Sequence, residues 1–215
     1  MAGLRALHRQ TRFNQMLNVA AELFASQGYE ATRIEEIAES AQVAPGTVYN
    51  YFTSKPNILM ALAVRHVRAA YPARRDLVRN PPKDPIEAIY AFEKLLTVQA
   101  LTTLNRECWR IIFSAPYREP DGPQHRLSRR FQGIIKRHYI QLLGGFQKRG
   151  SIKKDVDIHR LADLITAVGT YHFGRLVSSD TMTIEELQVA VEHHLDLVFT
   201  GVIARTPKKK KAATA

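Results

Sequence analysis

Residues 32–55 read TRIEEIAESAQVAPGTVYNYFTSK and carry the most specific structural signals in the chain. Its apolar residues recur at helical spacing in two short blocks, the first containing Ile34 and Ile37 and the second ending near Phe52. Between the blocks, Val43 offers an apolar plug for a tight turn, and Pro45 is pre-set for the first turn of a helix. Two short helices joined by such a turn predict a helix-turn-helix.

Local signals also indicate where helices begin. Residues 32–35 (Thr-Arg-Ile-Glu) have the pattern of a capping box, in which a threonine oxygen and a glutamate carboxylate each accept a backbone N–H. Residues 183–186 (Thr-Ile-Glu-Glu) repeat the pattern near the other end of the chain. We therefore expect one helix to start after Thr32 and another after Thr183.

The rest of the chain is also expected to be helical. Strand signals are nearly absent, while apolar residues recur every three or four positions. The run Asn80-Pro81-Pro82-Lys83 interrupts the pattern and marks an internal break. The further helices are expected at about residues 5–27, 54–74, 84–103, 105–114, 126–148, 157–177 and 184–200.

Composition bounds the class of protein. The 215 residues are 45% hydrophobic, which is enough to build a core, and the single cysteine, Cys108, excludes a disulfide framework. We expect no signal peptide and no membrane span, and hence a cytoplasmic protein. The formal net charge of +11 favours a polyanionic partner. Residues 1–70, however, carry seven Lys/Arg and five Asp/Glu, a net of only +2, so bulk charge does not mark the helix-turn-helix as the nucleic-acid site.

The N-terminal part of the chain resembles a known family. Residues 10–62 resemble the DNA-binding domain of the tetracycline-repressor (TetR) family of bacterial transcription regulators, on the stretch AAELFASQGYEATRIEEIAESAQVAPGTVYNYFTSK. The resemblance implies an all-α protein with a DNA-binding domain in residues 1–54, a linking helix at 55–74, and a ligand-binding and dimerisation domain within 55–205. Residues 206–215 are too polar and lysine-rich to fold and are expected to form a disordered basic tail.

The resemblance also implies which residues meet DNA. The start of the second short helix would face base edges in the major groove, and tyrosine and lysine side chains would hold the phosphate backbone. Asn50 falls at a variable position and would read sequence. The predicted DNA-binding residues are Thr32, Arg33, Pro45, Gly46, Thr47, Tyr49, Asn50, Tyr51 and Lys55.

Family members dimerise through their last two long helices, which suits a palindromic operator because two recognition helices then read two half-sites. The apolar residues expected at that interface are Leu161, Leu164, Ile165, Val168, Leu187, Val191, Leu195 and Val198. The predicted partners are double-stranded DNA, a small-molecule inducer and a second copy of the chain.

The C-terminal part offers candidates for inducer binding but no motif. Aromatic and histidine side chains are either pocket-lining residues or ordinary core; the candidates are Phe92, Trp109, Phe113, His138, Tyr139 and Tyr171. His193 and His194 point about 100° apart on a helix, so we expect no metal site and no cofactor.

The predicted function is therefore a sequence-specific DNA-binding regulator, a repressor released from a palindromic operator by a small molecule. One alternative is a non-specific nucleic-acid-binding protein, motivated by the net charge of +11. The other is a helical enzyme, motivated by the histidines. An enzyme is not expected, because the sequence has neither a nucleophile–base signature nor a glycine-rich phosphate loop.

Overall fold

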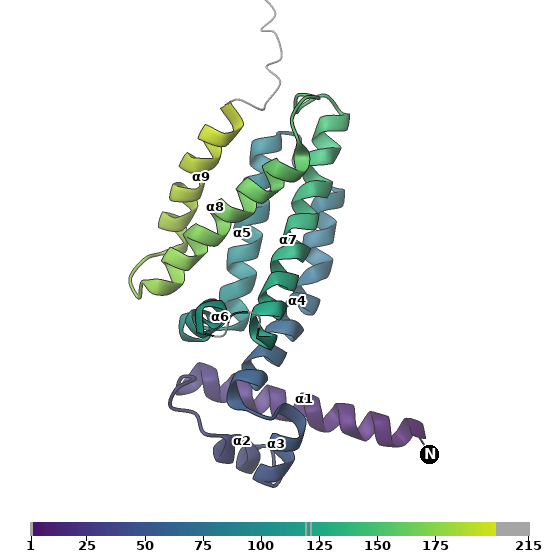
Figure 1. The fold of residues 1–215 in the computed structure, drawn as a ribbon, viewed down its shortest axis with the longest axis vertical. Helices are drawn as coiled ribbons and strands as arrows, with labels where there is room; N and C mark the ends of the chain where they lie inside the picture. The colour runs from purple at the N-terminus through teal and green to yellow at the C-terminus, as the bar shows by residue number, and fades with distance from the viewer. Residues whose placement is uncertain (1, 119, 121, 201–215) are drawn as a thin grey trace, which may run out of the picture.

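The structure is a computed structural model that describes residues 2–118, 120 and 122–200. Over these residues the chain forms nine α-helices and no β-strand, as expected for the all-α class (Figure 1). The predicted basic tail, residues 206–215, lies outside the described residues. The helices are α1 (Ala2–Ser26), α2 (Ile34–Ser40), α3 (Pro45–Phe52), α4 (Lys55–Arg79), α5 (Pro85–Thr103), α6 (Arg106–Arg118), α7 (Pro123–Lys148), α8 (Ile158–Ser178) and α9 (Ile184–Thr200).

The first three helices form a small unit at one end of the molecule (Figure 1). Helix α1 buries one apolar face, since Leu17, Ala20 and Phe24 are each at most 1% exposed. Phe13 packs on the same core, with its ring stacked on Phe52 of α3 at a centroid distance of 5.0 Å. The spacing of apolar residues along α1 thus fixes the platform that carries α2 and α3.

The capping box predicted at Thr32 is wrong by one residue. Helix α2 begins at Ile34 with Arg33 as its N-cap, and the Arg33 amide donates to a carboxylate oxygen of Glu36 at 2.7 Å. The Thr32 hydroxyl instead donates to the Gly28 carbonyl at 2.6 Å, because the side chain is buried under the turn that precedes the helix.

The second capping box is confirmed. The Thr183 amide donates to Glu186 at 2.8 Å, and the Glu186 amide donates back to the Thr183 hydroxyl at 3.1 Å. Here the threonine lies at the exposed start of α9, so no tertiary contact competes for its side chain.

Two helices run further than their sequence predicts, each through a proline. Helix α4 was expected to end near residue 74 and α6 near 114, but they contain Pro72 and Pro116 and extend to Arg79 and Arg118. Proline inside a helix removes one hydrogen bond and typically costs about 3 kcal/mol. Packing offsets this cost, because both helices bury side chains close to the proline, as Ala115 in α6 shows.

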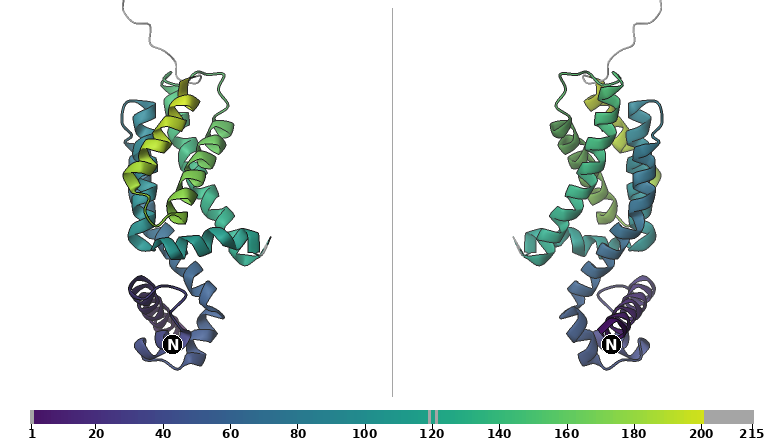
Figure 2. Two further views of the ribbon diagram at one scale, coloured as in Figure 1. Left: turned by 90° about the vertical axis from the view of Figure 1, so that its left-hand side faces the viewer. Right: turned by 90° about the vertical axis from the view of Figure 1, so that its right-hand side faces the viewer.

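Helices α5, α7, α8 and α9 pack with the second half of α4 as a bundle, and α6 lies crosswise between this bundle and the N-terminal unit (Figure 2). The buried residues fall into two hydrophobic clusters, one of which fills the bundle. The other joins α1–α3 to the start of α4, to Trp109 and Ile112 of α6, and to Val177 of α8. The core around the helix-turn-helix therefore continues into the larger domain.

Polar contacts fasten α6 to the N-terminal unit. Glu107 accepts the backbone N–H groups of Tyr29 and Glu30, one on each carboxylate oxygen and both at 2.9 Å. The Asn105 side-chain amide donates to the Phe24 carbonyl at the end of α1, also at 2.9 Å. The loop after α1 is thus bound to the first turn of α6.

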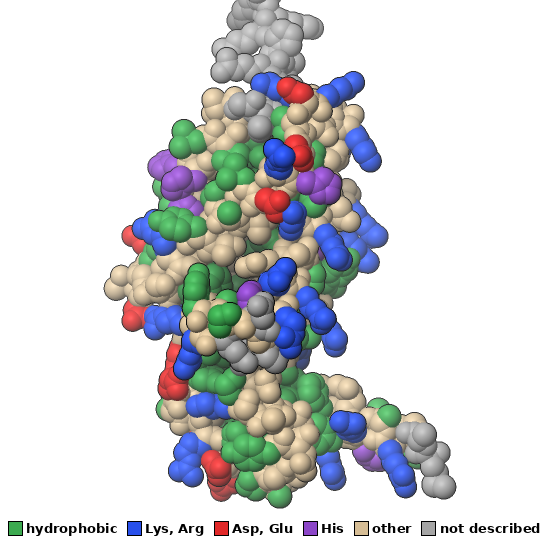
Figure 3. Space-filling model, in the orientation of Figure 1, with side chains coloured by type: hydrophobic (Ala, Val, Ile, Leu, Met, Phe, Trp, Pro, Cys, Tyr) green, Lys and Arg blue, Asp and Glu red, His purple; other side chains and the backbone are tan. Residues whose placement is uncertain are grey.

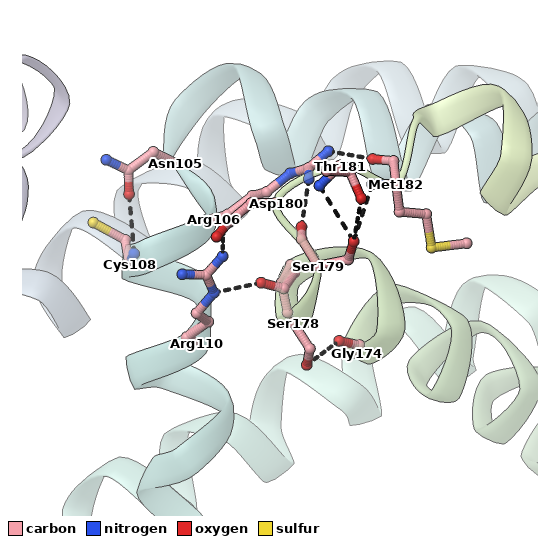
Figure 4. Close-up of polar contacts among 11 residues, drawn as sticks. Asn105, Arg106, Cys108, Arg110, Gly174, Ser178, Ser179, Asp180, Thr181 and Met182 are labelled. Carbon is pink, nitrogen blue, oxygen red and sulfur yellow. Dashed lines mark hydrogen bonds and ion pairs between the residues drawn. The ribbon is translucent and has the colours of Figure 1, made fainter.

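The same turn of α6 also holds the connection between α8 and α9 (Figure 4). Arg106 donates to the carbonyls of Ser179 and Met182, each at 2.5 Å, and Arg110 pairs with Asp180. The start of α6 is therefore a junction between the helix-turn-helix unit and the last two helices.

Replacing Glu107 by alanine should lower the free energy of unfolding by about 2 kcal/mol, because two backbone N–H groups lose a charged acceptor. Urea unfolding followed by circular dichroism would measure the change. Glu22→Ala is the matched control, since Glu22 is exposed on α1 and should give a change within about 0.5 kcal/mol. Equal stability of the Glu107→Ala variant and the wild type would show that the contact does not hold the two parts together.

Candidate DNA interface and ligand cavity

Helix α3 presents one face to solvent and buries the other. Val48 and Phe52 are buried, while Pro45, Gly46 and Asn50 are exposed. The division follows from helical spacing, because the two buried residues lie four positions apart. The exposed residues form a ridge at the far end of the molecule from the bundle (Figure 1).

The turn before α3 is tight. Gln42 adopts a left-handed conformation with φ of 53°, and the Val43 amide donates to the Ala38 carbonyl at 2.9 Å. Val43 packs half-buried against the core, as its predicted role as a plug requires. Ala44 gives α3 no side-chain cap, Pro45 has no N–H, and the Thr47 amide donates to the Ala44 carbonyl at 2.8 Å.

Gly46 leaves space on the exposed ridge. A Cβ atom built at this position would meet no protein atom within 4 Å. Packing inside the chain therefore does not require glycine here. The residue instead allows an outside surface to approach the helix backbone closely.

The two tyrosines of α3 have different surroundings. Tyr49 is 46% exposed, which leaves it accessible to a partner. Tyr51 is half-buried, with its ring 6.5 Å from that of Phe13 and the Arg9 guanidinium 5.9 Å from its own ring. Thr47 is half-buried, and Arg33 is exposed beside the start of α2.

Lys55 and Glu107 bind the same loop, Lys55 through the carbonyl groups of the loop and Glu107 through its amide groups. The Lys55 ammonium donates to the carbonyls of Tyr29, Glu30 and Thr32 at 2.9, 3.1 and 3.0 Å. Glu107 accepts the amides of two of these residues. Lys55 was expected to contact phosphate, but its three N–H bonds already have acceptors. In this structure Lys55 holds the loop between α1 and α2.

A cavity of about 300 Å³ lies inside the larger domain, enclosed by α4, α5, α6, α7 and α8, with α9 contributing at one side. Its wall is mostly apolar and aromatic, which is usual for a small-molecule site. Of the predicted ligand-binding residues, Trp109, Phe113 and Tyr139 line it.

The other three predicted ligand-binding residues do not line this cavity. Phe92 is fully buried, with its ring 5.0 Å from that of Tyr139, and His138 lies buried beside Phe92 at 5.7 Å. Tyr171 is 62% exposed on the outer side of α8. Local spacing predicted that these residues lie on helices, but it could not tell which of them face the inside of the bundle.

Sequence reasoning missed four buried polar residues of the cavity wall, which are His66, Arg74, Glu93 and Thr97. Each is less than 9% exposed. A signal was present on α5, where Glu93 occupies the same face as the apolar Ile89 and the buried Ala100. A charged residue at such a position is unusual unless it has a partner or a function.

Glu93 forms a buried pair with Tyr139. The Tyr139 hydroxyl donates to Glu93 Oε1 at 2.5 Å, and the carboxylate packs against Gly169 of α8, where a Cβ atom would lie 2.6 Å from Oε1. Burial raises the pKa of Glu93 to about 7, although the bond from Tyr139 opposes the shift. Glycine at position 169 therefore makes room for the carboxyl group at the cavity wall.

Other titratable groups of the described residues lie outside this cavity. Burial raises the pKa of the Cys108 thiol to about 12, so the sulfur is a buried, protonated group. His194 lies 2.8 Å from buried His172. In the described part of the chain, no group of three His, Cys, Asp or Glu side chains is arranged to hold a metal ion. Nor does any described helix combine the length and apolar character needed to cross a membrane.

The faces of α8 and α9 differ from the expected interface. Five of the residues predicted to meet a second copy are buried within this chain's own core: Leu161, Ile165, Leu187, Val191 and Leu195. The apolar residues that remain exposed on the two helices are Leu164 at 48%, Tyr171 at 62%, Val189 at 51% and Leu197 at 75%. Hydrophobic and histidine side chains are visible over α9 in Figure 3, whereas Lys and Arg gather along the opposite side, over α4 and α7.

Glu93 should make the stability of the protein fall as the pH rises. The pKa of the carboxyl group is 4.5 when unperturbed and about 7 in the folded protein. The folded state thus holds more protons between these values, and this stabilisation, present at low pH, is lost as the pH passes through about 7. The difference in unfolding free energy between wild type and Glu93→Gln should change by about 3 kcal/mol between pH 4.5 and 8.

Urea unfolding at a series of pH values would measure that difference. Glu87→Gln, on the exposed side of the same helix, is the control and should follow the wild-type profile. A constant difference between wild type and Glu93→Gln across this range would contradict the prediction.

Comparison with known proteins relates both parts of the chain to bacterial regulators. Residues 16–62 match the profile described as bacterial regulatory proteins, tetR family. The chain is 23% identical over 193 residues to the HTH-type transcriptional repressor KstR2 of Rhodococcus jostii, covering 84% of this chain and 90% of that protein. It is 33% identical over 87 residues to the HTH-type transcriptional regulator TcmR of Streptomyces glaucescens, covering 40% of this chain and only 38% of the relative.

Solved structures share the whole fold. FadR of Thermus thermophilus, a TetR family repressor in complex with lauroyl-CoA, matches with a TM-score of 0.69 at 19% identity, covering 91% of this chain and 97% of that one. FadR of Bacillus subtilis in complex with stearoyl-CoA matches with a TM-score of 0.65 at 19% identity, covering 88% and 98%. Because the profile covers the helix-turn-helix and the KstR2 match continues through the bundle, residues 16–62 form a DNA-binding domain of the tetR family of bacterial regulatory proteins, and the chain as a whole is similar to a transcriptional repressor.

Proposed function

We propose that this regulator is a repressor that binds a palindromic operator as a homodimer and is released when a small molecule enters the cavity. The observation that carries the proposal is the exposed ridge of α3 on one end of a molecule whose other end encloses a mostly apolar cavity of about 300 Å³. A regulator of this kind works on the chromosome, so we place it in the cytoplasm.

The DNA contacts follow from the exposure of each residue. Pro45, Gly46 and Asn50 would face the major groove with Thr47 beside them. The Tyr49 hydroxyl would donate a hydrogen bond to a phosphate oxygen. The remaining predicted residues act around this ridge: Arg33 and Tyr51 would meet the backbone, while Thr32 and Lys55 would hold the preceding loop in shape.

A second copy would pair through α8 and α9. Exposed apolar side chains on both helices, Leu164 and Tyr171 on α8 and Val189 and Leu197 on α9, support this choice of face. Two-fold pairing places two α3 helices on one side of a duplex, and both half-sites then contribute to affinity.

The class of inducer is suggested by the cavity and by the relatives. The wall is largely apolar, with an exposed Arg129 at its rim. Two structures of the same fold hold lauroyl-CoA and stearoyl-CoA, and KstR2 of Mycobacterium tuberculosis is described as a ketosteroid regulator. We propose an amphipathic molecule with a large apolar body.

Helix α6 offers a physical route from the cavity to α3. Trp109 and Phe113 of α6 line the cavity, and Glu107 of the same helix holds the loop after α1. A ligand that favours a different position of α6 would move this loop and the helix-turn-helix with it. The ligand then shifts the population toward a dimer whose α3 helices no longer match the two half-sites.

Selection of bound duplexes from a random pool tests the DNA part of the proposal. We expect an enriched palindrome with two half-sites about one helical turn apart, because a two-fold dimer reads the major groove twice. The Asn50→Ala variant should change the preferred bases, whereas Tyr49→Phe should weaken binding to every selected site by a similar factor. Binding without sequence preference at physiological salt would instead indicate a non-specific nucleic-acid-binding protein.

Gly46→Ala should separate DNA binding from folding. The added methyl group meets no protein atom within 4 Å, and alanine is favoured over glycine in a helix by up to about 1 kcal/mol. The variant should therefore be at least as stable as the wild type, yet bind the selected operator at least about 10-fold more weakly, because the methyl group blocks close approach. Fluorescence anisotropy with labelled operator would measure the affinity.

The matched control for this variant is Gly133→Ala, another helical glycine with open space around it, on α7. It should leave operator affinity unchanged. If Gly46→Ala binds the operator as tightly as the wild type, α3 does not approach the groove through this residue.

A further inference from the structure

A buried arginine stands in the wall of the cavity. Arg74 of α4 is 3% exposed and lines the cavity together with residues of α5, α6, α7 and α8. Its Nε–H donates to Gln99 Oε1 at 2.8 Å, and the Gln99 amide donates to the Ala70 carbonyl at 3.4 Å. The guanidinium is therefore held in one orientation by the helices around it.

The two amino groups of this guanidinium have no acceptor among the described residues, and no described carboxylate forms an ion pair with it. Glu93 lines the same cavity, but its carboxyl group is engaged with Tyr139 and packed against Gly169. The arginine thus brings charge into an apolar space and leaves most of its donors unused.

The other titratable groups around Arg74 do not balance its charge. Burial, together with the nearby Arg74 charge, lowers the pKa of His66 to about 4 and also lowers the pKa of His138. Both imidazoles are neutral at pH 7, and burial lowers the pKa of Arg74 itself only to about 10. The Arg74 guanidinium is therefore charged at neutral pH. Glu93, whose pKa is about 7, is only partly ionised there, and it is bonded to Tyr139 instead of to Arg74.

A buried charge without a partner is costly, and a protein usually keeps one only where something else pairs with it. The planar fork of a guanidinium matches the two oxygens of a carboxylate and binds it through two parallel hydrogen bonds. A plain hydrocarbon chain at this position would bury the charge further and leave it unpaired.

We propose that the ligand of this cavity carries a carboxylate on its inner end, bound by Arg74, with its apolar body packed between Trp109, Phe113 and Phe131. This inference rests on the proposed ligand-binding role of the cavity and names the chemistry of the ligand. Such a ligand differs from one that places only an uncharged tail inside the cavity and has its charged group bound at the rim.

Trp109 provides a direct readout, because it lines the cavity and is the single tryptophan of the chain. The full-length protein would be titrated with decanoate and decan-1-ol, and with 4-phenylbutyrate and 4-phenylbutan-1-ol, while tryptophan emission is followed. Within each pair the apolar body is the same and only the terminal group differs. We expect at least one acid to bind at least about 10-fold more tightly than its alcohol, and neither alcohol to bind more tightly than its acid.

Three variants locate the charge that is responsible. Arg74→Met should remove the preference for the acid while leaving alcohol binding within about threefold. Arg129→Met removes the exposed charge at the rim, and Arg75→Met removes an exposed charge on the same helix; both should keep the preference. Arg74→Met should also melt no lower than the wild type in the absence of ligand, because it removes an unpaired buried charge.

Several outcomes would overturn the inference. These are equal binding of acids and alcohols to the wild type, failure of both acids to bind, and loss of the acid preference in Arg129→Met rather than in Arg74→Met. If Arg74→Met does not fold, the arginine is structural, and that too counts against a ligand-binding role. The titration contains no DNA, so it tests the carboxylate site separately from release of the operator. If an acid is preferred here but does not release the operator in a separate DNA-binding assay, the proposed function fails and the carboxylate site stands.

Discussion

The loop of residues 28–32 is held by two opposite charges, and the arrangement of the whole molecule depends on it. Lys55 binds its carbonyl groups from the start of α4, and Glu107 binds its amide groups from the start of α6. Charged partners make these hydrogen bonds stronger than neutral ones. Two helices of the larger domain thereby fix where α1 ends and where α2 begins, and so set the position of the helix-turn-helix.

Apolar packing reinforces this junction. Trp109 and Ile112 of α6 belong to the same hydrophobic cluster as Phe24 of α1 and Val48 of α3. Because protein interiors are close-packed, a displaced helix shifts its neighbours instead of deforming alone. Trp109 also lines the cavity, so one side chain belongs both to the cavity wall and to the cluster that contains Val48 of α3. The hydrophobic core therefore continues across the boundary between the DNA-binding part and the proposed ligand-binding part.

The cavity combines an apolar wall with a small set of buried polar groups. Its polar residues come from different helices, Arg74 from α4, Glu93 from α5 and Tyr139 from α7. In a mostly apolar space such groups determine which ligands are accepted, because each unpaired donor or acceptor penalises a ligand that leaves it unsatisfied. If the cavity binds a ligand as proposed, Arg129 at the rim and Arg74 in the inner wall would contact different parts of it.

The helices, the helix-turn-helix and the exposed residues of α3 follow from local sequence signals, because apolar spacing, prolines and turn residues act over a few positions. The remaining features depend on tertiary contacts. Tertiary structure moved Thr32 from a helix cap to a buried turn, carried α6 through Pro116, bound Lys55 to carbonyls, and left Tyr171 outside while Arg74 and Glu93 faced the cavity. The reason is distance along the chain. A contact such as that between Glu107 and Tyr29 joins residues 78 positions apart, and local spacing tells which side chains share a helix face but not which neighbour that face will meet.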